Sequence, residues 1–439
     1  MFAWLRNLFC LIYDQAGWTT EMTVTGVADV DAAIPEHWAP SIFADGNRES
    51  FWGSLSGKEG EFMPVIDKTG KLKESGDTLR INIIEQLMGR GVTGENVLKG
   101  NEEKLGVGVM TVTADIVRHA VGISRKSTRQ ANFDENQRIK PLLSDWMGRK
   151  MDADGFTAIL DATNIDTLYA NSKTSAANLN ATDGDRFGPV EISMIGLALK
   201  RLGALPLKVR KVNGRSIPIY GCVFGEVEDY WLNQNTTFVN QIRDSWERFK
   251  AGGGEHPLYQ GAIGIYRNVI LYPYYANLDI PQGTALRPET TLSATLATAD
   301  VTAYAGVAGD SNTKANYTLF FASSGSLQVD SEIISYSGKS ISTFTGLTRG
   351  VSSTTAAQHS AGALVTQRNI ASVIGFGAQA LVRAMPENVE PIGEKDDYGE
   401  QLGLGIRAFY GFKVRYSKRR NKPAAAVVLK CLSDNPGTV

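Results

Sequence analysis

The sequence predicts an α+β fold that carries an inserted all-β module. Helical and strand-like periods alternate through residues 189–286, which is typical of a compact α+β unit. Strict two-residue alternation predicts further strands at 77–87 and 107–117. Between 289 and 366 the composition changes: Ser, Thr, Ala and Gly dominate, and few residues are charged. The 439 residues are enough for about three domains, or for one large domain with insertions.

The first 66 residues show no sustained period, and we expect them to wrap over other parts of the structure. The start, MFAWLRNLFCLIYDQAGWTTEM, resembles an export signal, but Arg6 interrupts the apolar run and no Ala-x-Ala pattern follows. An amphipathic helix or docking arm is favoured over a signal peptide, and translation could also start at Met22. No stretch reaches the ~20 apolar residues that a membrane span requires.

The glycine-rich stretch GRGVTGENVLKGNEEKLGVG, residues 89–108, lies between the two predicted strands. A phosphate-binding loop would need a helix N-terminus and a Lys-Ser/Thr pair, and neither is visible. A connection of about 20 residues is long for a hairpin, and long loops of this kind tend to be functional. We therefore expect an arm that lies on another molecule. A solvated loop without a partner is the alternative.

The clearest helix is predicted at 132–162, where Ile139, Leu143 and Met147 recur at helical spacing and Pro141 is expected to begin or kink a helix. Helices are also predicted at 189–205 and 238–250 and strands at 217–224 and 267–272. After the insert we expect strands at 402–417 and 424–432, and a polar turn at 386–401.

Two short glycine motifs do not predict ligand sites. Gly338-Lys339-Ser340 resembles the end of a phosphate loop, but Ile333 occupies the position of that motif's first glycine. GFGAQA at 375–380 matches a loose dinucleotide pattern without a βαβ unit around it. A strand with close backbone packing is the favoured interpretation there.

The sequence lacks the patterns that catalysis or metal binding would need. The densest carboxylate cluster, Glu394, Asp396 and Asp397, is interpreted as a solvated face. The four histidines are scattered along the sequence, which does not indicate a metal site. Cys10, Cys222 and Cys431 are odd in number and far apart, which indicates packed thiols in a reducing compartment. We expect no catalytic residues, no cofactor and no metal, and hence not an enzyme.

Charge is nearly balanced, with 45 basic against 46 acidic residues, which does not favour a protein that binds DNA through a basic surface. The predicted contact residues lie in two charged segments, the glycine-rich stretch and a polybasic segment at 413–422. We expect the polybasic segment to face acidic residues of a neighbouring chain. The predicted contact residues are Arg90, Glu95, Lys99, Glu102, Glu103, Lys104, Lys413, Arg415, Lys418, Arg419 and Arg420.

Three segments carry a family resemblance: GDTLRINIIEQLMGRGVTGENVLKGNEEKL (76–105), RHAVGISRKSTRQANFD (118–134) and EKDDYGEQLGLGIRAFYGFKV (394–414). In this order they resemble the major capsid proteins of tailed bacteriophages, specifically the N-four-like group with the HK-ninety-seven coat fold. The resemblance covers most of the chain outside 1–21 and 289–366.

The resemblance implies a domain order for the whole chain. It runs from an N-terminal arm (1–66) and an extended β-loop with flanking strands (67–125) to a spine helix and peripheral domain (126–188) and an axial-type α+β domain (189–286). The inserted all-β module (287–367) and a return segment that completes the peripheral and axial core (368–439) follow. FTGLTRGVSSTTAAQHSAGALV, 344–365, resembles a β-rich module of various phage structural proteins, and we expect it to protrude.

The implied function is a major capsid protein that self-assembles into pentamers and hexamers of an icosahedral shell around double-stranded DNA. The implied location is the virion, after assembly in the host cytoplasm. Partners would be other copies of the chain, scaffolding, portal and decoration proteins, and packaged DNA through weak non-specific contact, but no membrane. Some relatives crosslink a loop lysine to an asparagine; Lys99 and Lys104 are present, yet we predict no crosslink. The alternative is an adhesion or carbohydrate-binding protein that acts through the insert.

Overall fold

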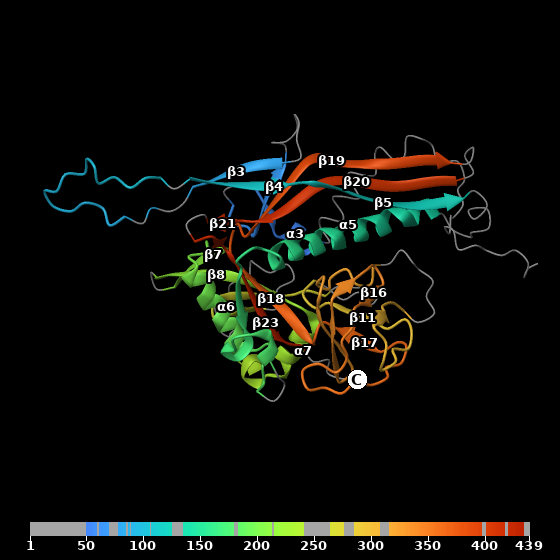
Figure 1. Cartoon of the computed structure of the whole chain (residues 1–439). Coiled ribbons are helices and arrows are strands. Elements are labelled where there is room, and N and C mark those ends of the chain that lie inside the picture. Colours follow the sequence, from blue (N-terminus) through green and yellow to red (C-terminus); the bar gives the residue numbers. More distant parts are fainter. Residues whose placement is uncertain are drawn as a thin grey trace, which may run out of the picture. The chain divides into compact units, whose positions relative to one another are not determined.

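The computed structural model describes residues 50–58, 61–69, 78–84, 87, 89–105, 107–124, 135–179, 183–212, 215–240, 264–275, 285–307, 316–396, 401–417 and 420–433. The chain divides into two compact units. The small unit comprises Met1–Asn47, Asp115–Gly148 and Glu387–Phe409, and the large unit comprises Arg48–Ala114, Arg149–Pro386 and Tyr410–Val439. Figure 1 shows the elements of both.

A mixed sheet forms the centre of the large unit. Its strand order is β6 (Asp166–Tyr169), β23 (Ala426–Leu432), β18 (Ile370–Phe376), β8 (Arg215–Phe224), β10 (Val269–Pro273) and β9 (Gly264–Tyr266), and β7 (Lys208–Val212) pairs with β8. β23, with the sequence AVVLKCL, is apolar almost throughout because it lies within the core, where side chains on both faces are covered.

Two helices of the large unit begin with the same pattern, a glycine followed by a buried glutamate three residues later. In α6 (Pro189–Arg201) these are Gly188 and Glu191, and in α7 (Glu226–Gln234) they are Gly225 and Glu228. Glu191 accepts a 3.1 Å hydrogen bond from the N–H of Asn171, whereas both carboxylate oxygens of Glu228 are buried and have no hydrogen-bond partner among the described residues. Burial raises the pKa of both carboxyl groups.

The helix α6 packs closely on the central sheet. A Cβ atom at Gly375 on β18 would lie 2.2 Å from Cγ2 of Ile195, so only glycine fits beneath the helix. At Gly377 a Cβ would lie 2.4 Å from the carbonyl oxygen of Leu205. The close backbone packing expected for GFGAQA is confirmed, but strand β18 ends at Phe376 and residues 377–380 lie in a turn region.

A buried carboxylate fixes the chain where the described residues begin. Asp152, on α5 (Glu135–Leu160), accepts hydrogen bonds from Ser50 Oγ at 2.7 Å and from the N–H groups of Phe51 and Trp52, each at 3.0 Å. These donors are the N-terminal groups of α3 (Phe51–Ser54), which a carboxylate satisfies well. Burial raises the pKa of Asp152 to about 6, while the hydrogen bonds from Ser50, Phe51 and Trp52 oppose that shift.

The large unit also contains a parallel arrangement of β1 (Ser56–Gly57), β2 (Val65–Thr69) and the first part of β19 (Leu381–Asp396). Asp67 and Arg383 are register partners on β2 and β19, and Arg383 binds the carboxylate through two hydrogen bonds of 2.6 and 2.7 Å. The guanidinium group is buried, so this bidentate pair balances a charge in the interior.

In the small unit, β5 (Asp115–Ser124), β20 (Gln401–Val414) and the outer part of β19 lie in the order β19-β20-β5. The imidazole of His119 stacks on the Trp146 ring of α5, with centroids 4.5 Å apart. The expectation of a polar turn at 386–401 is wrong, because β19 continues to Asp396. β2 pairs with β19 only as far as Met385, so Pro386 begins a stretch without that neighbour, where a strand tolerates proline.

The insert forms two small sheets. One has the order β11 (Glu289–Thr291), β17 (Leu364–Thr366), β13 (Gly325–Val329) and β14 (Glu332–Tyr336), and the other β12 (Thr302–Tyr304), β16 (Thr343–Thr345) and β15 (Gly338–Lys339). Leu327, Ile334, Phe344 and Val365 belong to a core of its own. Residues 289–366 are thus an all-β structure, as the composition predicts.

Most of the predicted elements are present. The strands predicted at 77–87, 107–117, 217–224 and 267–272 correspond to β3 (Thr78–Ile84), β4 (Val107–Thr113), β8 and β10, and the predicted helices at 132–162 and 189–205 to α5 and α6. The strand predicted at 402–417 corresponds to β20 and the short β21 (Tyr416–Ser417). The strand predicted at 424–432 corresponds to β23, and another short strand, β22 (Lys422–Pro423), precedes it. The helix predicted at 238–250 lies outside the described residues from 241 onward, and α7 was not predicted. Across the described ranges no helix is long and apolar enough to cross a membrane.

The buried ion pair between β2 and β19 yields a stability prediction. We expect Asp67→Ala to lower the free energy of unfolding by about 3 kcal/mol, because it leaves the buried Arg383 guanidinium without its carboxylate. Chemical denaturation of the soluble subunit measures this. Asp115→Ala, which removes an exposed carboxylate, is the control and should change the value by less than about 0.5 kcal/mol. Equal effects of the two substitutions would contradict the assigned role of the pair.

Candidate functional site

The first candidate contact surface is a two-stranded hairpin formed by β3 and β4. The strands pair antiparallel from Thr78 opposite Thr113 to Ile84 opposite Val107. One face packs into the large unit, where Leu79 and Val112 contact Val382 and Ala384 of β19. The other face of β4 is exposed, and 62% of Val109 is accessible to solvent. This exposed face carries Val107 and Val109 beside Thr111 and Thr113, so it is partly apolar.

The hairpin loop, residues 87–105, extends well beyond the ends of both strands (Figure 1). Gly91, Gly94 and Gly100 have φ angles of +69°, +72° and +92°, which favour glycine. Apart from the chain neighbours, no atom of the described residues lies within 4 Å of the Cβ positions there. Its turns are closed by local bonds, for example from the N–H of Asn101 to the carbonyl of Leu98 at 2.9 Å. The loop has a defined local shape but little support from the rest of the chain.

All of the predicted charged contact residues of this loop are exposed: Arg90, Glu95, Lys99, Glu102, Glu103 and Lys104. The structure adds apolar residues that sequence reasoning missed. Val97 and Leu98, at the turn, are 69% and 59% exposed, and Leu87 and Leu105 flank the loop. The signal that could have found them is an apolar pair within a loop too long to fold back on its own strands.

The polybasic segment is divided by the structure. Lys413 is exposed on β20, whereas Arg415 is half-buried and donates a hydrogen bond to Oε1 of Gln379. Burial lowers the pKa of Arg415. Arg420 is exposed, and Lys418 and Arg419 lie outside the described residues. A Cβ at Gly411 would lie 2.0 Å from the carbonyl oxygen of Thr113, so this part of β20 abuts the base of the hairpin and not its tip.

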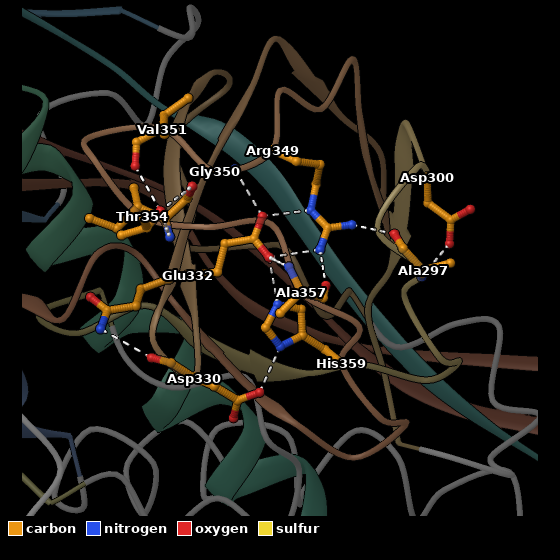
Figure 2. A network of polar contacts seen from close by, with 12 residues as sticks. Ala297, Asp300, Asp330, Glu332, Arg349, Gly350, Val351, Thr354, Ala357 and His359 are labelled. Carbon is orange, nitrogen blue, oxygen red and sulfur yellow. Dashed lines mark hydrogen bonds and ion pairs between the residues drawn. The ribbon is translucent and has the colours of Figure 1, made fainter.

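A second candidate is a buried polar network in the insert, shown in Figure 2. Glu332 on β14 is at its centre: Arg349 donates to its two oxygens at 2.8 and 2.7 Å, and the N–H groups of Gly350 and Ala357 donate at 2.9 Å each. His359 Nε2 lies 2.8 Å from Glu332 Oε2, and its Nδ1 lies 2.6 Å from Asp330 Oδ2. Both ring nitrogens thus face carboxylates.

This network ties down a long irregular segment. Between β16 and β17 the chain runs through residues 346–363 without a strand, and Arg349, Gly350, Ala357 and His359 all attach it to Glu332. Burial alone would raise the pKa of Glu332, but the hydrogen bonds from Arg349, Ala357, His359 and Gly350 lower it to about 2. Since Glu332 and His359 are buried and fully bonded, the network is structural and offers no free base or nucleophile.

A cavity of about 790 Å³ lies between the insert and the central sheet of the large unit. Phe320 and Lys339 line it from the insert, and Ile165, Arg368 and Lys430 line it from the opposite side. Lys339 is already engaged: its ammonium group donates to the carbonyls of Thr318, Leu319 and Phe321. The lysine of the Gly-Lys-Ser tripeptide therefore supports backbone, in agreement with the rejected phosphate-loop interpretation.

The described residues contain no cluster of three or more His, Cys, Asp or Glu side chains that could hold a metal ion. Cys222 and Cys431 are buried and free, and burial raises the pKa of both thiols. The side chains of Glu394, Asp396 and Asp397 lie outside the described set. What the geometry offers is contact surface: an exposed hairpin with a charged and apolar tip, and a compact module with a fixed surface.

The chain thus combines a long exposed hairpin, a 26-residue helix and an inserted β module. Residues 25–187 match a family model described as Phage capsid protein. No curated protein sequence matches the chain at a significant level. The family match covers the hairpin and α5.

Solved phage capsids share the fold over nearly the whole chain. The capsid of Ralstonia phage GP4 aligns with a TM-score of 0.58 at 15% identity, covering 97% of this chain and 98% of that chain. The cyanophage Pam1 capsid has a TM-score of 0.54 at 14% identity, with 95% and 98% covered. The head of Helicobacter pylori bacteriophage KHP40 has a TM-score of 0.54 at 14% identity, with 88% and 92% covered. The predicted resemblance to phage capsid proteins is confirmed in the fold, and the family model supports it over residues 25–187.

The network around Glu332 predicts a pH dependence. The folded-state pKa of about 2 lies below the ordinary value of 4.5, so the ionised group stabilises the fold above about pH 4.5, and this stabilisation is lost as the pH falls toward 2. Glu332→Gln cannot titrate. We expect calorimetry to show a lower melting temperature for E332Q than for wild type at pH 7, and a smaller gap between the two at pH 3. A gap of equal size at both pH values would contradict the proposed role of the carboxylate.

Proposed function

We propose that the chain is the major capsid protein of a phage and self-assembles, as pentamers and hexamers, into an icosahedral shell that encloses double-stranded DNA. The observation that carries the proposal is the hairpin of β3 and β4, whose outer face and loop expose apolar groups on a chain with the coat-protein fold. One subunit leaves this surface uncovered. A neighbouring copy, present at high local concentration in a shell, covers it.

The hairpin supports the proposal because an isolated two-stranded ribbon is at best marginally stable in water. Its base is held by the contacts of Leu79, Met110 and Val112 with β19, and no described residue of the loop belongs to that cluster. Burying Val97 and Leu98 on a neighbour would contribute about 1.5 to 3 kcal/mol each, before the entropy cost of ordering the loop. The flanking charges of both signs suit a surface with complementary charges.

The glycines of the loop support an adjustable contact. Gly91, Gly94 and Gly100 have open space around them, so the tip can change its direction without a clash. A shell needs such freedom because identical subunits occupy non-identical positions and the shell expands as it matures. The tip would keep its apolar contact while the base of the hairpin stays fixed on the large unit.

The remaining assignments follow from the same proposal. The shell belongs to the virion and is assembled in the host cytoplasm, with scaffolding, portal and decoration proteins as further partners. The predicted contact residues retain that role, and Lys413 and Arg420 offer exposed cations for a neighbour's acids or for weak contact with packaged DNA. The chain would act without catalysis.

The adhesion alternative loses support from the insert. A carbohydrate-binding surface needs exposed aromatic rings, but Tyr317, Phe321, Tyr336 and Phe344 are buried in the core of the module. Tyr304 is exposed, and Phe320 is half-buried at the cavity. The described part of the insert therefore presents no row of aromatic side chains.

The hairpin tip provides the test. We expect the double substitution Val97→Asp and Leu98→Asp to leave a soluble, folded subunit that forms no closed particles, because the tip can no longer be buried on a neighbour. Circular dichroism checks the fold, and sedimentation with electron microscopy checks assembly.

The matched control is Val190→Asp, which changes an equally exposed valine in the first turn of α6, where an acidic residue is tolerated. V190D should form particles as the wild type does. Closed shells from the double tip variant would refute the role assigned to the hairpin.

A further inference from the structure

The cavity between the insert and the central sheet has one face of that sheet as its floor. Alternate residues of a strand point to opposite faces, and Gly375 of β18 lies beneath α6. Ile370 and Ser372 lie an odd number of residues before Gly375, so they point to the other face, and both line the cavity. Lys430 of β23 is the register partner of Ser372 and lines the cavity too. Paired strands therefore fix the positions of these side chains on the floor.

Lys430 is an unusual residue for its place in the sheet. It is the one residue of β23 that is not fully buried, and the one charged residue in the strand sequence AVVLKCL. Its half-buried side chain lines the cavity, yet no described residue accepts a hydrogen bond from its ammonium group or forms an ion pair with it. A lysine this enclosed is costly without a counter-charge, because its ammonium group loses part of its hydration. Lys430 thus indicates a negatively charged partner that the described residues do not supply.

Arg368 brings a second cation to the same cavity. It lies in the turn between β17 and β18, where Arg368 and Asn369 have φ angles of +58° and +49°. The N–H of Asn369 donates to Oγ1 of Thr366 at 3.1 Å, which closes the turn. Nη2 of Arg368 donates to the carbonyl of Ala177 at 3.2 Å, and its other N–H groups have no acceptor within the described ranges. The turn thus holds a planar group with several available donors beside the cavity.

The other walls of the cavity combine charge with apolar surface. Lys339 lines it from the insert, and the carbonyl groups that hold its ammonium group are neutral, so they do not balance its charge. Asp161 also lines the cavity, but it is exposed just after the end of α5, and no ion pair joins it to the cations there. Phe320 and Ile165 supply apolar surface. The volume of about 790 Å³ is within the range of small-molecule sites.

We propose that this cavity binds a small organic anion, whose phosphate or carboxylate group is held by Lys430 and Arg368 and whose apolar part lies against Phe320. Arginine and lysine are the side chains that proteins use to hold the oxygens of both head groups. Ser372, beside Lys430, can donate its hydroxyl to the same oxygens.

The site lies within a single subunit, so this inference goes beyond shell formation and does not depend on it. Phe320 belongs to the insert, whereas Lys430 and Ser372 belong to the central sheet. A ligand that contacts both parts would stabilise the attachment of the insert, because it binds only when the two walls of the cavity are in place.

The first test measures binding to the soluble full-length chain by isothermal titration calorimetry. Phenyl phosphate and benzoate present the two head groups on the same ring, and benzyl alcohol is the neutral control. We expect saturable binding of at least one of the anions, with the tighter of the two identifying the head group, and no binding of benzyl alcohol. No binding of either anion, or equally tight binding of benzyl alcohol, would overturn the proposal.

The second test assigns the binding to Lys430. Lys430→Met keeps the length of the side chain but removes its charge, and should weaken binding of the anion by about tenfold or more, the loss expected for one charge-assisted hydrogen bond. Lys430→Arg keeps the charge and should retain most of the affinity. The matched control is Lys200→Met, which changes an exposed lysine in the last turn of α6, on the opposite face of the sheet, and should bind as the wild type does.

Arg368→Gln gives an independent measurement, which decides the matter if circular dichroism shows that K430M does not fold. Glutamine keeps a donor for the carbonyl of Ala177 but removes the positive charge, so R368Q should also weaken binding of the anion. A folded K430M or R368Q variant that binds the anion as tightly as the wild type would overturn the assignment of the site.

Discussion

The apolar surface that the hairpin leaves uncovered is the constraint on which the rest of the account depends. Leu79, Met110 and Val112 bury one face of β3 and β4 on the large unit, while Val109, Val97 and Leu98 remain in solvent. Apolar side chains on such a loop contribute to stability only when another molecule buries them. This exposed apolar surface supports the proposed association of the subunit with other copies of the chain.

Buried polar contacts supply the rigidity from which such a loop can project. Asp152 fixes residues 50–52 on α5, Asp67 neutralises Arg383 between β2 and β19, and Glu332 fastens the long segment of the insert. Each contact joins segments far apart in sequence, and each satisfies charged groups that would otherwise be costly to bury. The flexible element, the glycine-containing loop, is confined to the region where a neighbour is expected.

Local patterns predicted much of this fold because their apolar residues are buried against other parts of the same chain. The alternation in DTLRINII and VGVMTVT, the helical spacing of Ile139, Leu143 and Met147, and the change of composition at the insert were sufficient. The extension of β19 past Pro386 was missed because its sequence is polar and contains prolines. A strand tolerates proline where one side lacks a hydrogen-bonded neighbour, and β19 has lost the neighbour β2 from Pro386 onward. The network of Glu332, Arg349 and His359 depends on contacts across the module that no local period encodes.

The most direct test of the central claim is cryo-electron microscopy of particles assembled from the full-length chain. The account predicts closed shells in which Val97 and Leu98 are buried against an adjacent subunit while the base of the hairpin keeps its contact with β19. Closed shells in which the loop remains in solvent, with subunits joined through other surfaces, would contradict it.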